Sequence, residues 1–344
     1  MASAPVRPAR RIRVAATVLT LTATAALAAG CSALDGDPSP AGGPAPAGSG
    51  APAPERVPPA QSLSPFTGQA ARQGPVLAVK FDNASEARPH TGIGDADIVY
   101  VEKVEGGMSR LMGVYSGKLP KAAGPVRSAR ESDIELLRQF GRPALAYSGV
   151  RSALLKTLQD SPVHARTHTD VPEAYFRQSG RPAPHDLFVR PKALLRSMPK
   201  ADRPADIGFR FGPAPAGGTP MARMAVDYDL ASHTFDWSAD EGRWLASFDG
   251  APARSTSGAR LGARTVVIQY VTMRSSRYKD YTGAVTPYIE TVGGGEALVL
   301  RDGKSYPTRW ARPSATAGTT FTLPDGRRMP FAPGQVWIVY ADRS

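Results

Sequence analysis

Alternating apolar and polar residues mark the first ordered part of the chain, which begins near Val76. Residues 76–81, 98–105 and 109–115 predict three strands, because apolar side chains recur there at two-residue spacing between turn residues. Gly106-Gly107 lies between the last two, and both glycines tolerate the positive φ of a two-residue hairpin turn. The pattern therefore predicts a β-hairpin beside a first, separate strand.

The predicted hairpin register determines which side chains share a face of the sheet. With Glu105 opposite Met108, alternation separates two sets of side chains. One face carries Lys103, Glu105 and Arg110, and the other carries Tyr100, Glu102, Val104 and Leu111. Because an unpaired buried charge costs several kcal/mol, Glu102 on the more apolar face needs a cationic partner. Arg127 and Arg130 are the partners that the sequence offers.

A helix start follows the hairpin. Ser128 and Glu131 have the spacing of a capping box, in which the hydroxyl and the carboxylate each bind a free backbone amide. Apolar residues then recur at three-residue steps, which predicts a helix over 129–140. Arg127 and Arg130 flank the cap, so that free amides, the positive end of the helix dipole and two guanidinium groups would meet. Such a site suits a carboxylate or a phosphate.

The rest of the first half mixes strands and helices. A strand is expected at 144–147, and helices are expected at 152–159 and 191–198. This mixture predicts an α+β or α/β N-terminal domain over residues 66–205.

Beyond Gly208 the pattern changes to strands alone. Alternating runs between Gly, Asp and Pro turns predict strands at 221–226, 233–237, 243–248, 264–272, 285–291, 297–301 and 336–340. Asp302-Gly303 and Asp325-Gly326 are hairpin turns that need positive φ. We therefore expect a mainly β C-terminal domain over residues 206–344, joined to the first domain between about residues 203 and 222.

Export signals precede the predicted domains. Four arginines, and an apolar run over 14–27 that is shorter than a membrane span, have the order of a signal peptide over residues 1–30. Cys31 is the only cysteine, so no intramolecular disulfide can form. We expect a lipid on Cys31 that anchors the protein to the extracytoplasmic face of the cell membrane; the alternative is an ordinary secretory signal with an incidental thiol. Residues 31–65 are nearly all Pro, Ala, Gly, Ser or polar, which predicts an unfolded tether.

The net positive charge of the chain indicates which classes of partner it could bind. The formal net charge is +12, and removal of the four arginines of the signal (12 minus 4) leaves +8 on the exported part. Arginine, alanine, proline and glycine are all abundant, a composition that a GC-rich genome produces without any ligand. We therefore expect no nucleic acid as partner, and we expect an anionic envelope polymer, a phosphorylated ligand or lipid headgroups instead.

Several sequence blocks carry a family resemblance. One is Gly124-Pro125-Val126-Arg127-Ser128-Ala129-Arg130, and the others lie at 79–83, 88–93, 96–100, 104–110, 184–188, 303–310 and 333–337. Together they resemble the YerB-like family of bacterial lipoproteins, whose two domains have no known function. The resemblance implies a two-domain, lipid-anchored envelope protein and no particular reaction. The chain departs from the family at His90 and Asp186, where Gln and Asn are more frequent.

The candidate binding residues gather around the predicted helix start. They are Glu102, Glu105, Arg110, Arg127, Ser128, Arg130 and His185. Two interpretations of the arginines stay open: they bind an external anion, or they form a helix cap and neutralise acids of the protein itself. His185 precedes Asp186, which could orient an imidazole for acid-base chemistry or cap a turn.

Motifs for other chemistries are weak or missing from the sequence. His164 and His168 have a four-residue spacing but lack the glutamate of the zinc-protease motif, so no metal and no cofactor are expected. There is no Gly-x-Ser-x-Gly elbow and no phosphate-binding loop. Two function hypotheses follow. The first is a non-catalytic module that binds an anionic envelope component, and the alternative is a hydrolase or transferase that acts on envelope glycan through acidic residues and His185.

Overall fold

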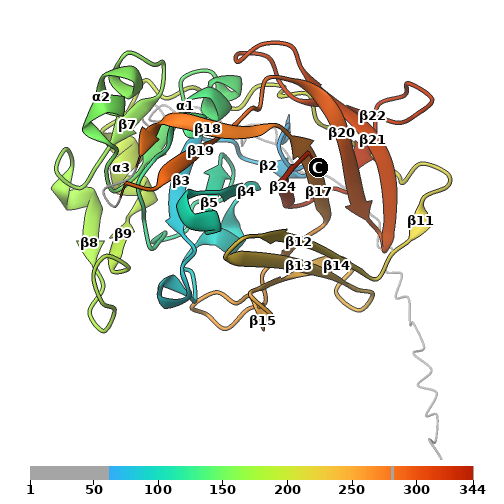
Figure 1. The fold of residues 1–344 in the computed structure, drawn as a ribbon, viewed down its shortest axis with the longest axis horizontal. Helices are drawn as coiled ribbons and strands as arrows, with labels where there is room; N and C mark the ends of the chain where they lie inside the picture. The colour runs from blue at the N-terminus through green and yellow to red at the C-terminus, as the bar shows by residue number, and fades with distance from the viewer. Residues whose placement is uncertain (1–61, 280–282, 344) are drawn as a thin grey trace, which may run out of the picture. The chain divides into compact units, whose positions relative to one another are not determined.

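One large sheet forms the centre of the protein in the computed structural model, which describes residues 62–279 and 283–343 (Figure 1). The sheet has 11 strands. Their order in space is β11 (Thr219–Pro220), β21 (Lys304–Arg312), β20 (Gly293–Arg301), β17 (Thr265–Val271), β24 (Val336–Asp342), β4 (Ile98–Lys103), β5 (Ser109–Tyr115), β3 (Leu77–Asp82), β6 (Ala144–Ala146) and β7 (His164–Arg166), with β22 (Thr320–Thr322) paired to β21. The predicted signal peptide, Cys31 and nearly all of the predicted tether lie outside the described residues.

The large sheet contains strands from both halves of the chain. β24, the last strand, lies parallel to β17 on one side and parallel to β4 on the other, where Val336 pairs with Ile98. Strand hydrogen bonds therefore cross the predicted junction between residues 203 and 222. The boundary itself stays a prediction, because the two halves share this sheet.

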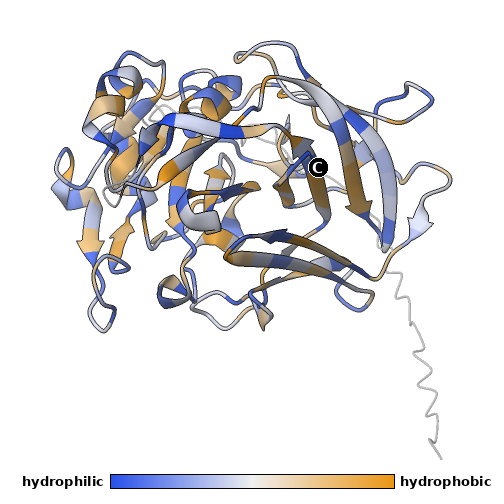
Figure 2. Ribbon diagram, in the orientation of Figure 1, coloured by the Kyte–Doolittle hydropathy of each residue, from blue (hydrophilic) through white to orange (hydrophobic). Residues whose placement is uncertain are grey.

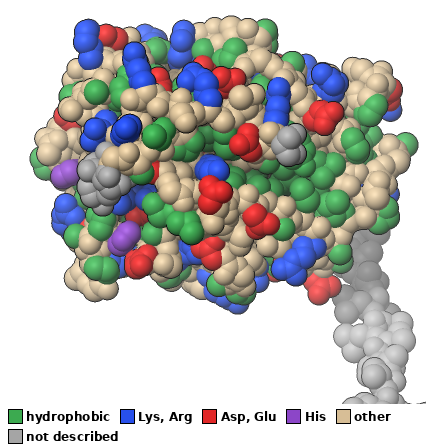
Figure 3. Space-filling view, in the orientation of Figure 1, with side chains coloured by type: hydrophobic (Ala, Val, Ile, Leu, Met, Phe, Trp, Pro, Cys, Tyr) green, Lys and Arg blue, Asp and Glu red, His purple; other side chains and the backbone are tan. Residues whose placement is uncertain are grey.

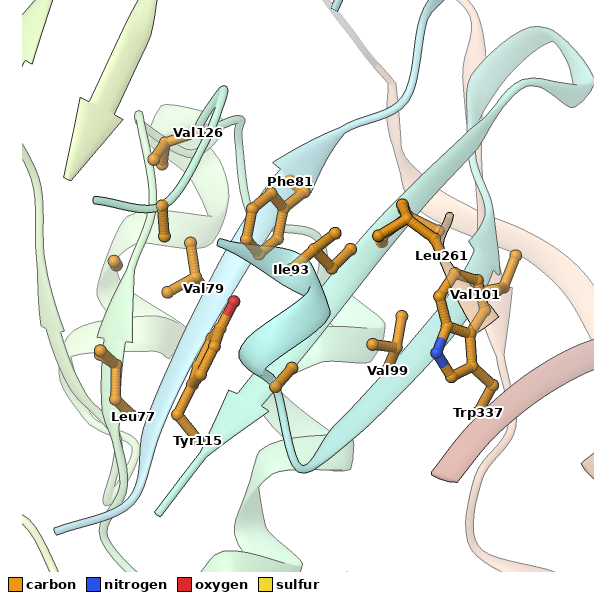
Figure 4. Packing of buried hydrophobic residues seen from close by; sticks show 14 of the residues in the cluster. Leu77, Val79, Phe81, Ile93, Val99, Val101, Tyr115, Val126, Leu261 and Trp337 are labelled. Atoms are coloured by element: carbon orange, nitrogen blue, oxygen red, sulfur yellow. The ribbon is translucent and has the colours of Figure 1, made fainter. Parts of the chain in front are cut away.

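A smaller sheet packs against one face of the large one. It has 5 strands: β12 (Arg223–Tyr228), β13 (Ala231–Ser238), β14 (Arg243–Phe248), β15 (Ala251–Pro252) and β16 (Gly262–Ala263). Phe235 and Phe248 of this sheet contact Trp337 of β24 at ring-centroid distances of 5.8 and 6.1 Å. The core continues through Phe81 and Tyr115 of the large sheet, as Figure 4 shows. Burial of this apolar surface holds the two sheets together.

The opposite face is partly covered by helices α1 (Glu131–Leu137) and α2 (Ser152–Gln159), in the first half of the chain. Helix α3 (Pro191–Arg196) lies on the same face as the smaller sheet, because its Leu194 belongs to the core that contains Phe81 and Tyr115. Leu136 of α1 and Leu158 of α2 belong to a second core, which also contains Tyr100 of β4 and Tyr340 of β24. The central strands, with cores on both faces, carry mostly apolar residues in Figure 2.

A hairpin from the second half reaches across to the first. β18 (Met273–Lys279) and β19 (Val285–Ile289) pair with each other and extend over α1 (Figure 1). The Ser132 hydroxyl of α1 accepts a hydrogen bond from the Ile289 amide at 2.9 Å, and the Tyr288 hydroxyl donates to Glu135 at 2.6 Å. The guanidinium of Arg312, on β21, donates to the Glu135 carbonyl at 2.7 Å. The end of α1 is therefore fixed by the second half of the chain.

Short two-stranded pairs complete the described structure. They are β1 (Ser62–Leu63) with β2 (Ala70–Ala71), β8 (Tyr175–Arg177) with β9 (Leu187–Val189), and β10 (Arg210–Phe211) with β23 (Pro330–Phe331). β1 includes residues that the sequence pattern placed in the tether.

Most predicted elements are present. The predicted helix at 152–159 matches α2, and the turn at Asp302-Gly303 joins β20 to β21 with φ of 51° and 71°. The described part of the chain is mostly β, and its three α-helices lie in the first half. That half combines parallel pairs (β3, β6, β7) with antiparallel ones (β3, β5, β4), so neither α+β nor α/β describes it alone.

The predicted helix start at Ser128 is wrong. The helix α1 begins at Glu131, and the Asp133 carboxylate accepts a hydrogen bond from the Arg130 amide at 2.7 Å. The Ser128 hydroxyl instead lies 3.3 Å from the hydroxyl of Ser148. An acid of the protein therefore occupies the helix N-terminus, because Asp133 sits at the third helical position where its carboxylate can reach back.

The predicted hairpin register is wrong by one residue. Lys103 pairs with Ser109, and residues 105–107 form a single 3₁₀ turn, so the loop is longer than two residues. Since side chains alternate, this slip moves every β5 side chain to the other face. Arg110 consequently lies on the same face as Glu102, whereas Leu111 points into the opposite core.

Two buried histidines, His90 and His233, are expected to make the unfolding free energy depend on pH. Burial lowers the pKa of His90 to about 4 and that of His233 to about 3. Neither ring nitrogen of His233 has a hydrogen-bond partner in the described part of the chain. Because the unfolded state binds protons with a pKa near 6.5, each histidine contributes stability above that pH, which is lost progressively as pH falls towards the lowered pKa of the folded state.

We expect His233→Phe to gain stability over the wild type on acidification. Phenylalanine has no ring nitrogen to protonate, so the difference in unfolding free energy should grow by about 1 kcal/mol between pH 7.5 and 5.5 in favour of the variant. Urea denaturation of both proteins at the two pH values measures this difference. Comparison of the two proteins cancels the titration of the carboxyl groups, and an unchanged or reversed difference would contradict a neutral, buried His233.

Candidate functional site

Four charged side chains lie on the face of the large sheet that α1 covers. Lys80 and Asp82 alternate with apolar residues along β3, and Arg110 of β5 pairs in register with both Asp82 and Glu102. All four are nearly or fully buried. A charge in such a position must be paired, because burial removes its hydration. The pairs that form divide this face into two groups.

Lys80 is shared by two acids. Its ammonium contacts the carboxylate of Glu102 and lies 2.7 Å from that of Asp133, in α1. Burial opposes the charge of Lys80, but the two acids outweigh it and raise its pKa. Burial, followed by the charge of Asp133, raises the pKa of Glu102 to about 8. Lys80 can balance the charge of only one of the two carboxylates, so Glu102 keeps its proton at neutral pH.

Asp82, two residues after Lys80 on β3, has cationic partners. Its carboxylate lies 3.2 Å from Arg110, 3.0 Å from Nε of Arg127 and 2.7 Å from Nδ1 of His185. The amide of Ala84 also donates to it. Burial alone would raise the pKa of Asp82, but Arg110 and Arg127 outweigh that effect and lower it. Asp82 is therefore an ionised anchor that positions three side chains.

Glu105 and Arg130 form a two-bond pair. Nε and Nη2 of Arg130 each donate to one oxygen of Glu105 at 2.7 Å. The hydroxyl of Thr286, on the hairpin β18–β19, donates to the same carboxylate at 2.6 Å. Burial opposes ionisation of Glu105, but the bonds and charge of Arg130 and the bond from Thr286 lower its pKa to about 2. This pair joins the β4–β5 loop, the start of α1 and the second half of the chain.

A cleft of about 510 Å³ opens beside these pairs. Its lining includes four arginines, which are Arg110, Arg127, Arg130 and Arg151. We call it the arginine cleft. Ser128, Met108, Leu154 and Tyr278 add polar and apolar surface, the last from β18. Elsewhere on the surface, in the view of Figure 3, Lys and Arg side chains are interspersed with Asp and Glu.

Two glutamates line the arginine cleft, and both have protein partners. Glu105 is bound to Arg130, and Glu131 accepts a hydrogen bond from Ser276 at 2.6 Å. Nε of Arg127 lies 3.0 Å from Asp82, and the Arg127 side chain is 24% exposed. Its two terminal nitrogens make no hydrogen bond to another residue within 62–279 and 283–343. The cleft can therefore hold an anion by the open fork of Arg127.

The structure brings five of the seven predicted site residues together. Glu105, Arg110, Arg127, Ser128 and Arg130 all line the arginine cleft. The other two, Glu102 and His185, are not part of this lining. Glu102 is buried, and the expectation that an arginine would be its partner is wrong, because the cation in contact with it is Lys80.

Sequence reasoning missed Lys80 and Asp82. Each interrupts an apolar strand, and a charge within such a run indicates a buried partner. The register that brings Arg110 beside Asp82 depends on the length of the loop between β4 and β5, which the sequence pattern does not determine. The histidine pair His164 and His168 lines a different cavity, and the described residues contain no group of three or more metal-binding side chains.

Comparisons with known proteins match nearly all of the described chain. Residues 63–204 match a family model described as "Protein of unknown function (DUF3048) N-terminal domain", and residues 224–338 match its C-terminal counterpart. The protein YerB of Bacillus subtilis (strain 168), named there as a candidate lipoprotein, is 26% identical over 277 residues, which cover 76% of this chain and 80% of YerB.

A solved structure has the same fold. The crystal structure of YerB protein from Bacillus subtilis matches with a TM-score of 0.70 at 20% identity, over 81% of this chain and 96% of that one. Among the residues that our structure describes, none of the helices is long and apolar enough to span a membrane.

The shared cation Lys80 generates a test of the buried cluster. We expect Glu102→Gln to fold and to gain stability relative to the wild type as pH rises from 5 to 9. The raised pKa of Glu102 means that its contribution is present at low pH and is lost as pH rises through about 8, whereas glutamine does not titrate. Urea denaturation across this range measures the difference between the two proteins.

The matched variant is Lys80→Met. It leaves two buried carboxylates without their cation, so it should lower the unfolding free energy by about 3–5 kcal/mol. Equal destabilisation by both variants at every pH would contradict a protonated Glu102.

Proposed function

Because this chain belongs to the family of the DUF3048 N- and C-terminal domains, we propose that it is a lipid-anchored envelope protein that binds an anionic component in the arginine cleft. The relative YerB is named as a candidate lipoprotein, which supports anchoring of this chain through Cys31. The binding role is non-catalytic. Its ligand carries phosphate or carboxylate groups of the cell envelope, on the extracytoplasmic face of the membrane.

The observation that carries the proposal is the imbalance of charge in the cleft. Four arginines face two glutamates, and both glutamates already have partners. Arg151 is exposed, and Arg127 lines the cleft with a side chain that is 24% exposed. An anion would therefore gain charge-assisted hydrogen bonds without displacing an acid of the protein. Leu154, Met108 and Tyr278 offer an apolar wall to the rest of the ligand.

A hydrolase or transferase is the second candidate, and one contact favours it. His185 Nδ1 lies 2.7 Å from Asp82 Oδ2, an arrangement that can orient an imidazole. The acids that such a reaction needs are otherwise engaged, however. Glu102 is sealed with Lys80, Glu105 is held by Arg130, and Asp82 is fully buried among its cations. No pair of carboxyl groups is left to act on a glycan in the cleft.

We expect Arg127→Ala to weaken anion binding at least tenfold, because the open guanidinium fork is lost. Pyrophosphate and citrate are the probes, measured by isothermal titration calorimetry, and affinity for the wild type should fall as salt rises. Asp82 keeps Arg110 and His185, so the unfolding free energy should fall by only about 1–2 kcal/mol.

The control is Arg223→Ala, an exposed arginine on β12 outside the cleft. It should bind both probes as the wild type does. Equal binding by Arg127→Ala and the wild type would overturn the proposed site, and a loss of stability without any ligand effect would make Arg127 a structural residue only.

The anchor has its own test. We expect the full-length protein to fractionate with membranes and its N-terminal peptide to carry a lipid on Cys31, since burial of acyl chains gains about 0.8 kcal/mol per methylene. Cys31→Ala should remove the lipid and release the protein from the membrane fraction. Mass spectrometry of the N-terminal peptide decides between lipidation and an ordinary secretory signal, which would leave Cys31 unmodified or absent.

A further inference from the structure

A second cavity adjoins the arginine cleft. It has a volume of about 700 Å³ and lies beside α2 and β7, and Arg166, His164 and His168 are among its lining residues. We call it the histidine cavity. Gly149 and Val150 line both cavities, so the loop after β6 is their common wall.

The two cavities are held in place by one set of backbone bonds. The Ser148 amide donates to the Arg127 carbonyl, and the Ala129 amide donates to the Gly149 carbonyl, both at 3.0 Å. The segment that carries Arg127 and the loop that separates the cavities therefore form a single paired unit. A ligand group at Arg127 lies at a fixed position relative to this loop.

Both cavities lie at the same edge of the sheet. β3, β6 and β7 are parallel neighbours, and their carboxyl ends are Asp82, Ala146 and Arg166. Residues 127–131 line the arginine cleft, whereas residues that directly follow β6 and β7 along the chain line the histidine cavity. In open sheets of parallel strands, ligands bind outside the carboxyl ends of the strands.

The histidine cavity also favours an anion. Its acid Asp170 is bound to the amide and hydroxyl of Thr167 at 2.7 and 2.8 Å. Arg166 is exposed, and its side chain donates only to the carbonyl of its neighbour Ala165 among the described residues. His164 and His168 each have a buried ring nitrogen without a hydrogen-bond partner in the described part of the chain. Buried polar atoms without a partner are rare in proteins, so these ring nitrogens are available to bind a ligand.

The two cavities meet at Gly149, which we call the crossing point, and the space beside this residue is open. A side chain added at Gly149 would meet no atom within 4 Å, and the backbone there does not need glycine, since its φ is not positive. Each cavity holds several hundred Å³, so one compact anion fills only one of them. A chain that carries anionic groups along its length could occupy both and pass over Gly149.

We propose that the ligand is a linear polyanion with repeated phosphate or carboxylate groups, which lies across Gly149 and engages Arg127 in one cavity and Arg166 in the other. The proposal rests on the anion binding proposed above and adds the shape of the ligand. Two linked contacts gain affinity because the second forms within one complex, at the effective concentration that the chain itself sets.

The experiment compares short and long probes on the full-length protein without its lipid. Tripolyphosphate is the short probe, and long-chain polyphosphate and poly-glutamate are the long ones. Concentrations are expressed per anionic group, so that chain length alone does not raise the apparent affinity. The wild type should bind one of the long probes at least tenfold more tightly than the short probe. Whichever long probe wins identifies phosphate or carboxylate as the preferred group.

Variants locate the effect. Gly149→Trp fills the crossing point and should reduce the affinity for the long probe to that for tripolyphosphate, which it should still bind. Arg166→Ala should do the same from the far side. Ala153→Trp is the matched control, because Ala153 is exposed on α2 and lines neither cavity. It should leave all affinities unchanged.

The outcomes separate the two proposals. Binding of tripolyphosphate that depends on Arg127, with no gain for long chains or no effect of Gly149→Trp, overturns the linear ligand and keeps the anion site. Failure of every probe to bind overturns both. Loss of tripolyphosphate binding in Gly149→Trp would mean that the loop shapes the arginine cleft itself, which also contradicts the crossing.

Discussion

The parallel pairing of β24 with β4 is the contact on which the rest of the structure depends. The last strand of the chain inserts between a strand of the second half and a strand of the first, and it is fully buried along most of its length. An isolated first half would therefore expose one edge of β4, with unpaired backbone groups and an apolar face. The two family domains are distinct in sequence, but each completes the sheet of the other.

This pairing also fixes the arginine cleft. Once β24 is in place, the hairpin β18–β19 lies over α1, and Thr286 and Tyr278 become part of the wall around residues of the first half. Arg312 holds the end of α1 from β21. A cleft built from both halves keeps its shape only when the halves are joined, so the anion site belongs to the whole fold and not to one domain.

Burial of the charged side chains costs hydration free energy, but their need for partners selects one strand register. Lys80 and Asp82 are two residues apart on one strand and attract partners of opposite sign. A slip of β5 by one residue would move Arg110 away from Asp82 into an apolar core, at a cost of several kcal/mol. The charges therefore select one register among those that the apolar pattern alone would allow.

The sequence predicts the elements well and the site only in part. Strands and helices follow from local patterns of apolar residues, so α2 and the turn at Asp302-Gly303 appear as expected. The cluster of Arg127 and Arg130 follows from spacing along the chain. The partners of Glu102 and Arg110 do not, because they depend on a loop of five residues, 104–108, whose conformation is set by tertiary contacts. A change of one residue in the register of β5 against β4 moves the charged side chain of Arg110 to the other face of the sheet.

The same tertiary contacts give two neighbouring arginines different roles. Arg130 commits Nε and Nη2 to both oxygens of Glu105, so its fork is used in holding the β4–β5 loop to the start of α1. Arg127 lies near Asp82 through Nε, and it shares that carboxylate with Arg110 and His185. Arg127 lines the cleft on a backbone segment bonded to the loop at Gly149. The two arginines therefore differ in their partners: both oxygens of Glu105 are bound by Arg130, whereas Arg127 shares Asp82 with two other side chains.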